Sequence, residues 1–232
     1  MEDLSHYNPE GSTLRRAQLR MLEILKVVEA ICTKHNIEYT LSCGSLLGAV
    51  RHGGFIPWDD DIDISLLRPD YEKLLSILLN DNNQNFKLLT PNIDGYYYSF
   101  AKVVDTRTKV LEKNLSDNDN MGVWVDIFPL DGVRKQKSFH SMILHLMDKC
   151  RAAAINKSFP KEKYHKYMYL PWKLCRLIGY SFFLKHTIKM SQSYAINKSQ
   201  FVAHMPESYS FCIPKHIMET TTDVIFEGKY YK

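Results

Sequence analysis

Residues 44–64 read GSLLGAVRHGGFIPWDDDIDI, and the acidic end of this stretch decides the fold prediction. Asp61-Ile62-Asp63-Ile64 alternates carboxylates with β-branched apolar side chains, a period that fits a β-strand. Asp61 and Asp63 are therefore expected on one face of the strand, and the two isoleucines on the core side. Two carboxylates this close raise each other's pKa unless a cation lies between them, and Mg²⁺ is commonly held by carboxylates and phosphates.

The residues before these acids fit phosphate binding. Gly44 and Ser45 follow an apolar run, residues 37–41, and precede apolar residues at helical spacing. A Gly-Ser turn that opens a helix presents backbone N–H groups and the positive end of the helix dipole to an anion. Arg51 adds a positive charge at the end of that helix. A single Gly-Ser or Asp-x-Asp is common in exposed loops, so the prediction depends on their combination with a later acidic strand.

The later acidic strand is residues 123–128. Val123, Val125 and Ile127 are expected on its core face, which leaves Asp126 on the other face with two large aromatic residues. An Asp in that position is either the buried partner of an arginine or a third carboxylate beside Asp61 and Asp63. We favour the third carboxylate.

Three segments of the chain resemble the LicD family, which includes bacterial phosphocholine transferases and resembles fukutin and fukutin-related protein. They are residues 44–64, the lysine-containing segment FAKVVDTRT at 100–108, and the acidic segment GVWVDIFPLDG at 122–132. The similarity covers roughly residues 12–133. It implies the nucleotidyltransferase fold, an α+β class with a mixed β-sheet core flanked by helices.

The resemblance also implies a reaction and its residues. The family moves a phospho-alcohol group, such as phosphocholine, from a CDP-activated donor to a hydroxyl of a cell-surface glycan, lipid-linked glycan or teichoic acid precursor. The catalytic residues are then expected to be Asp61, Asp63 and Asp126. The same three, with Asp59, are expected to hold Mg²⁺ or Mn²⁺. The donor phosphates are expected at Gly44, Ser45, Arg51 and Lys102, although Arg51 and Lys102 could instead form surface ion pairs.

Two other functions stay open from the sequence. One is a nucleotidyltransferase of the same fold that uses a nucleoside triphosphate, and the other is a catalytically inactive binding subunit. Members of the family continue well past a segment such as Phe226-Glu227-Gly228, whereas this sequence runs to Lys232. We therefore expect a chain truncated relative to the family. The retained acids favour an enzyme.

Composition places the chain among ordinary globular proteins. It has 232 residues, 45% hydrophobic and 24% charged, with a formal net charge of +4, so no nucleic acid partner is expected. The five cysteines include no CxxC pair and are expected to be reduced, which indicates a cytoplasmic protein. We expect neither a signal peptide nor a membrane-spanning helix.

The periodicity predicts a catalytic core at 1–133 and a mostly helical C-terminal lobe at 134–232. In the core, the expected helices and strands are 12–34, 37–43, 60–66, 69–79, 86–89, 96–104, 108–115 and 123–128. In the lobe, the expected helical segments are 138–157, 164–169 and 174–188. The lobe interleaves lysines with aromatic residues. It is either the solvated face of a helical bundle or a surface that contacts lipid at the inner face of the membrane.

Overall fold

The computed structural model describes residues 5–81, 83–93, 95–111, 121–134, 138–159, 166–204 and 211–232. Its first half contains η1 (Ser5–Tyr7), α1 (Thr13–His35), β1 (Thr40–Leu41), α2 (Cys43–His52), β2 (Asp63–Leu67), α3 (Arg68–Leu79), β3 (Phe86–Leu89), β4 (Ala101–Asp105) and β5 (Trp124–Val133). Its second half contains α4 (Phe139–Ile155), η2 (Lys166–Met168), α5 (Tyr169–Ile178), α6 (Tyr180–Ser191), η3 (Ile196–Lys198), β6 (Phe201–Ala203), β7 (Ile213–Pro214), α7 (Lys215–Glu219), β8 (Val224–Phe226) and β9 (Lys229–Tyr231). This is the predicted α+β class.

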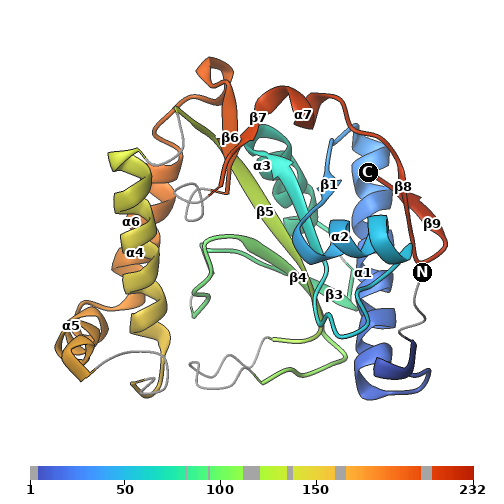
Figure 1. Cartoon of the computed structure of the whole chain (residues 1–232), viewed down its shortest axis with the longest axis horizontal. Helices are drawn as coiled ribbons and strands as arrows, with labels where there is room; N and C mark the ends of the chain where they lie inside the picture. The colour runs from blue at the N-terminus through green and yellow to red at the C-terminus, as the bar shows by residue number, and fades with distance from the viewer. Residues whose placement is uncertain are drawn as a thin grey trace.

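The centre of the fold is a mixed sheet in the order β1-β2-β5-β4-β3 (Figure 1). Strands β2 and β5 pair in parallel, whereas β1 with β2, β4 with β5 and β3 with β4 pair antiparallel. The far end of β5 pairs with β6, which in turn pairs with β7. The long strand β5 therefore joins the sheet to the region of α4 and α6 (Figure 1).

One face of this sheet forms the main core. Ile62, Ile64, Val125 and Ile127 are all fully buried there, in one cluster with the apolar faces of α1 and α3. Fully burying such a side chain contributes roughly 1.5–3 kcal/mol. Because side chains alternate along a strand, Asp63 and Asp126 must point to the opposite face.

Helix α1 begins and ends where its capping groups predict. The Ser12 Oγ accepts a hydrogen bond from Arg15 N at 3.0 Å, which satisfies a first-turn donor. Asn36 ends the helix in the left-handed conformation, and Ile37 N then donates to Cys32 O at 2.9 Å. This bond ties Ile37 to the end of α1, so the first strand starts later than predicted, at Thr40.

Three other strand predictions were wrong in their bounds. The second strand begins at Asp63, so Asp61 and Asp59 precede it. Of the expected strand 96–104, only residues 101–104 lie in the sheet, and β4 continues one residue further, to Asp105. Thr108–Leu111 is irregular, since Thr108 Oγ1 donates to Asp105 O and accepts from Val123 N in a tight turn. The rest of that predicted strand, 112–115, lies outside the described residues.

Strand β5 continues through Pro129, where the sequence predicted its end. Asp126 N donates to Ile62 O of the β2 side at 2.8 Å. By alternation along the strand, the nitrogen of Pro129 faces the opposite edge. At that edge the pairing with β4 has ended at Ile127 and the pairing with β6 starts only at Asp131. The missing N–H of proline therefore removes no ladder bond there.

The region after residue 133 contains more than helices. Helices α4 and α6 pack on each other at one end, whereas the hairpin β8–β9 lies beside α2 and α1 (Figure 1). Its Phe226 is fully buried in the main core. The domain boundary at 133 stays a prediction. Over the described ranges, no helix is both long enough and apolar enough to cross a membrane.

Candidate active site

The three predicted carboxylates come together. Asp63 opens β2, Asp126 lies near the start of β5, and the parallel register places these two residues directly opposite each other. Asp61 precedes β2 by two residues. Asp61, Asp63 and Asp126 can each offer an oxygen within 4.8 Å of the others, and within the described ranges Asp59, Asp60 and Asp61 form a second such group.

The electrostatics of this cluster favour a cation. Burial, together with the nearby carboxylates of Asp61, Asp126 and Asp59, raises the pKa of Asp63 to about 8. Burial, with Asp61 and Asp60 adding to it, likewise raises the pKa of Asp59 to about 6. The pKa of Asp61 is also raised, mainly by burial. Each of these upward pKa shifts means that the ionised carboxylate lacks enough positive charge nearby to balance it.

Asp59 provides a specific test of whether a metal fits. Its Oδ2 is buried and has no hydrogen-bond partner within the described part of the chain. A methyl group in place of the Gly44 hydrogen would lie 2.5 Å from that oxygen, so glycine leaves the space that Asp59 occupies. Carboxylate oxygens are the ligands that hard divalent cations prefer. Asp61, Asp63 and Asp126 therefore have the composition and spacing of a divalent-cation site, and Asp59 adds an unpartnered carboxylate oxygen in the group that it forms with Asp61.

Helix α2 is attached directly to this cluster. Ser45 is buried, and its Oγ accepts a hydrogen bond from Asp63 N at 2.9 Å. The N-cap residue of α2, Ser42, makes no side-chain capping bond. The first N–H groups of any helix also lack partners inside the helix. Gly44 and Ser45 thus stand beside the acids, as predicted. The Ser45 side chain fixes β2 as well.

Lys102 is brought to the cluster, where it forms a buried ion pair; its contact with the donor phosphates stays a prediction. Its Nζ lies 2.5 Å from Asp126 Oδ1, and the lysine is only 2% exposed. Three aromatic rings surround the ammonium, with ring centres at 4.2 Å for Trp124, 4.6 Å for Tyr98 and 5.2 Å for Phe100. Burial raises the pKa of Asp126 to about 6, and Lys102 opposes that rise. Asp126 is therefore both a member of the cluster and the partner of a buried cation.

Arg51 is not brought to the cluster. It lies in the last turn of α2 and is exposed, whereas Gly44 and Ser45 lie in the first turn. Seven residues of helix correspond to about 10 Å. Its role in phosphate binding remains a prediction.

A groove of about 550 Å³ lies near the cluster, although none of the four aspartates is among its described lining residues. Ser65 and Phe128 line it, each two residues beyond Asp63 and Asp126 on its own strand. His204 also lines it and packs against the Phe128 ring, with centres 5.0 Å apart. Neither ring nitrogen of His204 has a partner among the described residues, and both are buried, although the residue as a whole is half-buried.

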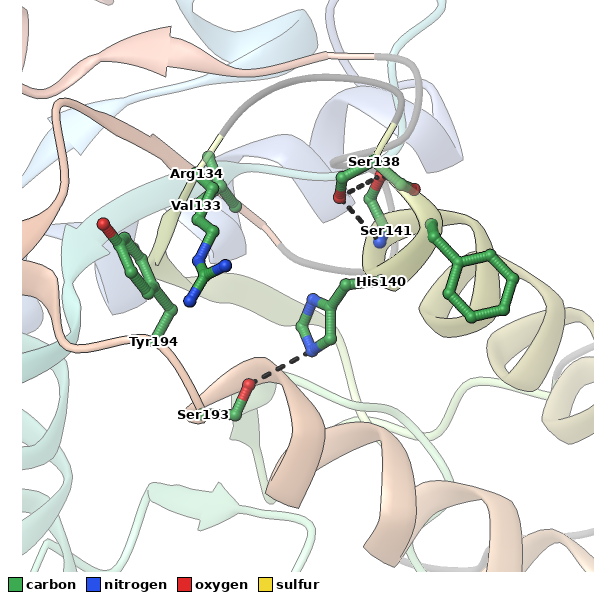
Figure 2. Close-up of a pocket in the computed structure, with 9 residues that line it drawn as sticks. Val133, Arg134, Ser138, His140, Ser141, Ser193 and Tyr194 are labelled. Carbon is green, nitrogen blue, oxygen red and sulfur yellow. Dashed lines mark hydrogen bonds between the residues drawn. The ribbon is translucent and has the colours of Figure 1, made fainter.

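A second cavity, of about 450 Å³, lies at the far end of β5 and the start of α4 (Figure 2). Figure 2 shows the Arg134 guanidinium beside the Tyr194 ring, at 5.3 Å from the ring centre, and the hydrogen bond of 3.1 Å between His140 and Ser193. None of its described lining residues belongs to the acidic cluster. It is not part of the candidate active site.

Comparison with known proteins identifies the family. The family LicD/FKTN/FKRP, nucleotidyltransferase domain, matches residues 36–177, more than half of the chain. The chain belongs to this family. The match includes Gly44, Lys102 and all four aspartates, but neither His204 nor the C-terminal hairpin.

Two relatives have names that describe a phosphotransfer activity. Lipopolysaccharide cholinephosphotransferase LicD of Haemophilus influenzae is 33% identical over 154 residues, which is 66% of this chain and 56% of that protein. Ribitol 5-phosphate transferase FKRP of Mus musculus is 39% identical over 69 residues, 29% of this chain and 14% of that protein. The chain thus spans little more than half the length of the first relative and less of the second.

Sequence reasoning missed the surroundings of the acids. The aromatic rings around Lys102 come from residues near β4 and β5, and only the pairing of Lys102 opposite Asp126 shows that they meet. His204 arrives from β6, and the spacing of the histidines gave no reason to place it near the sheet. Glu227 fixes the loop after α2, accepting from Phe55 N at 3.2 Å and pairing with Arg15 at 2.8 Å. No local pattern marks such a distant contact.

Proposed function

We propose that this chain is a metal-dependent transferase of phospho-alcohol groups. It takes a group such as phosphocholine from a CDP-activated donor and passes it to a hydroxyl of a cell-surface glycan or teichoic acid precursor. One observation carries the proposal: Asp63, Asp126 and Lys102 stand in a row across three neighbouring strands, with Asp61 beside them. The named relatives of the family, both phosphotransferases, support it.

Asp61, Asp63, Asp126 and Asp59 are the residues that hold the metal, for which we propose Mg²⁺ or Mn²⁺. When bound, such an ion neutralises the donor diphosphate and stabilises the charge that develops on its bridging oxygen. The acidic cluster supports this role because the raised pKa values of Asp59 and Asp63 reflect uncompensated negative charge.

The chain's own groups supply positioning and proton transfer. The first turn of α2 binds the donor phosphates through the N–H groups of Gly44 and Ser45. Lys102 holds the Asp126 carboxylate in place. Asp126, with a pKa of about 6, takes the proton from the acceptor hydroxyl. The oxygen of that hydroxyl bonds to phosphorus as the bond from phosphorus to the departing CMP breaks. The groove beyond Phe128 takes the acceptor.

The test is release of CMP from CDP-choline, CDP-ribitol and CDP-glycerol, with and without Mg²⁺, by wild type and two variants. We expect divalent-dependent release, reduced at least about 100-fold in Asp63→Asn. Asp81→Asn is the control, because Asp81 is an exposed acid that belongs to neither acidic group; we expect a change of less than about tenfold. Turnover of a nucleoside triphosphate with release of pyrophosphate would instead indicate a nucleotidyltransferase. Donor binding without turnover would indicate an inactive binding subunit.

We also propose that the chain acts in the cytoplasm, at the inner face of a membrane, where precursors of surface glycans are assembled. The charge of the region after residue 165 supports this location, since residues 166–204 contain six lysines and arginines and no acidic residue: Lys166, Lys173, Arg176, Lys185, Lys189 and Lys198.

A further inference from the structure

Helix α5 exposes its apolar side chains. None of its residues, Tyr169–Ile178, is buried. Leu170 is 74% exposed, Leu174 is 56% exposed and Leu177 is 85% exposed. These three, with Ile178, follow the spacing i, i+4, i+7 and i+8, so they form one stripe along the helix. Single exposed leucines are ordinary on protein surfaces, but a continuous stripe marks an interaction surface.

The helix is held firmly from its other side. Trp172 stacks on Tyr169 with ring centres 5.7 Å apart, and both rings contact Phe159. Arg176 Nη1 donates to Lys157 O at 2.7 Å. Figure 1 shows α5 at the outer end of the helical region, away from the sheet. The leucine stripe is thus part of a preformed helix and faces away from the rest of the described chain.

The residues around the leucine stripe are positively charged, which favours a negatively charged partner. Lys173 and Arg176 belong to α5 itself, and Lys185 and Lys189 belong to the neighbouring α6. Over residues 166–204 the sequence has no Asp or Glu to balance them. Tyr167, at 73% exposed, and Tyr169, at 44% exposed, add aromatic groups beside the stripe. Leucines flanked by basic and aromatic residues on a short helix are typical of helices that lie in the headgroup region of a bilayer.

We propose that α5 is a membrane-surface helix, whose stripe of Leu170, Leu174, Leu177 and Ile178 inserts into an anionic lipid leaflet. The lysines of α5 and α6 then supply positive charge beside the lipid headgroups. This proposal rests on the membrane location given with the proposed function and assigns it to one helix. Because lipid binding needs no transfer chemistry, it can be tested separately from catalysis.

The test is co-sedimentation of the whole chain with two kinds of vesicle: phosphatidylcholine alone, and phosphatidylcholine with an equal part of phosphatidylglycerol. We expect binding to the anionic vesicles at low salt, with a loss at about 0.5 M NaCl, where screening shortens charge interactions to a few ångströms. Leu177→Glu should lower the bound fraction at least about tenfold. Leu177 is so exposed that this variant should fold normally.

Leu79→Glu is the matched control, because Leu79 on α3 is 62% exposed and receives the same added charge. It should bind the vesicles like wild type. Asp63→Asn should also bind like wild type, which separates lipid binding from catalysis. Two results overturn the proposal: equal binding by Leu177→Glu and wild type, or no binding of wild type at low salt. A dimer that Leu177→Glu converts to a monomer, without vesicle binding, would show that the stripe instead binds a second copy of the chain.

Discussion

Asp63 and Asp126 are neighbours in the sheet, yet of these two only Asp126 has an ion pair in the described part of the chain. Asp63 lies among like charges, and its pKa is raised to about 8. The two carboxylates therefore make opposite contributions to stability when no metal is bound. Asp63 costs stability wherever it is ionised, and Asp126 compensates a buried lysine.

A matched pair of variants separates these contributions. Asp63→Asn removes a repelling charge, so we expect the melting temperature in EDTA at pH 8 to be unchanged or higher. Asp126→Asn leaves the Lys102 ammonium buried without its carboxylate, and breaking such a pair costs about 3–5 kcal/mol. We expect its melting temperature to fall. Both variants should lose transfer activity. Equal melting temperatures would contradict the pairing of Lys102 with Asp126 as a source of stability.

His204 should make stability depend on pH. Burial lowers its pKa to about 4, an effect that Arg151 and Arg68 strengthen and Asp131 and Asp148 weaken. In the unfolded chain the same group has a pKa near 6.5 and gains its proton first. The stability from His204 is therefore present above about pH 6.5 and is lost as the pH falls towards 4.

Urea unfolding at pH 7 and pH 5 measures this effect. Wild type should lose about 1–2 kcal/mol more than His204→Phe between these two values, since the phenylalanine cannot titrate. The control is His140→Phe, which removes a histidine from the separate cavity of Figure 2. It should keep the wild-type dependence. If His204→Phe keeps it as well, the buried neutral histidine is not its source.

Two glycines of α2, Gly44 and Gly48, pack against the loop that joins α2 to β2 and contains Asp59. A methyl group at Gly48 would lie 2.5 Å from Gly54 O and 2.9 Å from Ile56 N, both backbone atoms. At Gly44 the nearest atom is Asp59 Oδ2, in a side chain that can rotate. The substitution at Gly48 must move the loop, and the substitution at Gly44 need only move the side chain of Asp59.

We therefore expect different losses from the two alanine variants. Gly48→Ala should lower the free energy of unfolding by about 1–3 kcal/mol, the usual cost of overpacking. Gly44→Ala should lower it less, but should weaken Mn²⁺ binding measured by calorimetry. A Gly44→Ala protein with normal Mn²⁺ affinity would argue against Asp59 as a ligand.

The sequence predicted elements best where a local signal fixed them. Ser12 marks the start of α1 through its own side chain, and Ser138 caps α4 in the same way. Alternation of side chains also placed Asp63 and Asp126 on the face away from the core. Strand ends were predicted less well because they depend on partners. Pro129 remains inside β5 only because β4 stops before it and β6 starts after it.

At the scale of the whole molecule, the hairpin β8–β9 belongs to the main core. Phe226 is fully buried against Phe55, with ring centres 4.9 Å apart, whereas Tyr230 of the same hairpin is 65% exposed. Lys232 O also accepts a hydrogen bond from Leu41 N at 2.7 Å, beside β1. Contacts over this range of sequence could not be predicted from spacing, which is why the sequence assigned residues 134–232 to a lobe of their own.

This pair of aromatic residues tests the contribution of the hairpin. Phe226→Ala should cost about 3–5 kcal/mol, because it opens a cavity in a closed core. Tyr230→Ala should change stability by no more than about 0.5 kcal/mol. Chemical denaturation of both variants provides the measurement. Similar small losses would mean that the core is complete without the hairpin.

The ion pair between Arg15 and Glu227 joins positions 212 residues apart in the chain. A ribosome adds about 5–20 residues per second, so roughly 10–40 s separate the synthesis of its two partners. During that interval Phe55 lacks the Phe226 ring that packs against it, and the core cluster that includes α1 lacks one of its members. The nascent chain must carry this apolar surface uncovered, and a chaperone that binds apolar segments has time to act on it before the core can close.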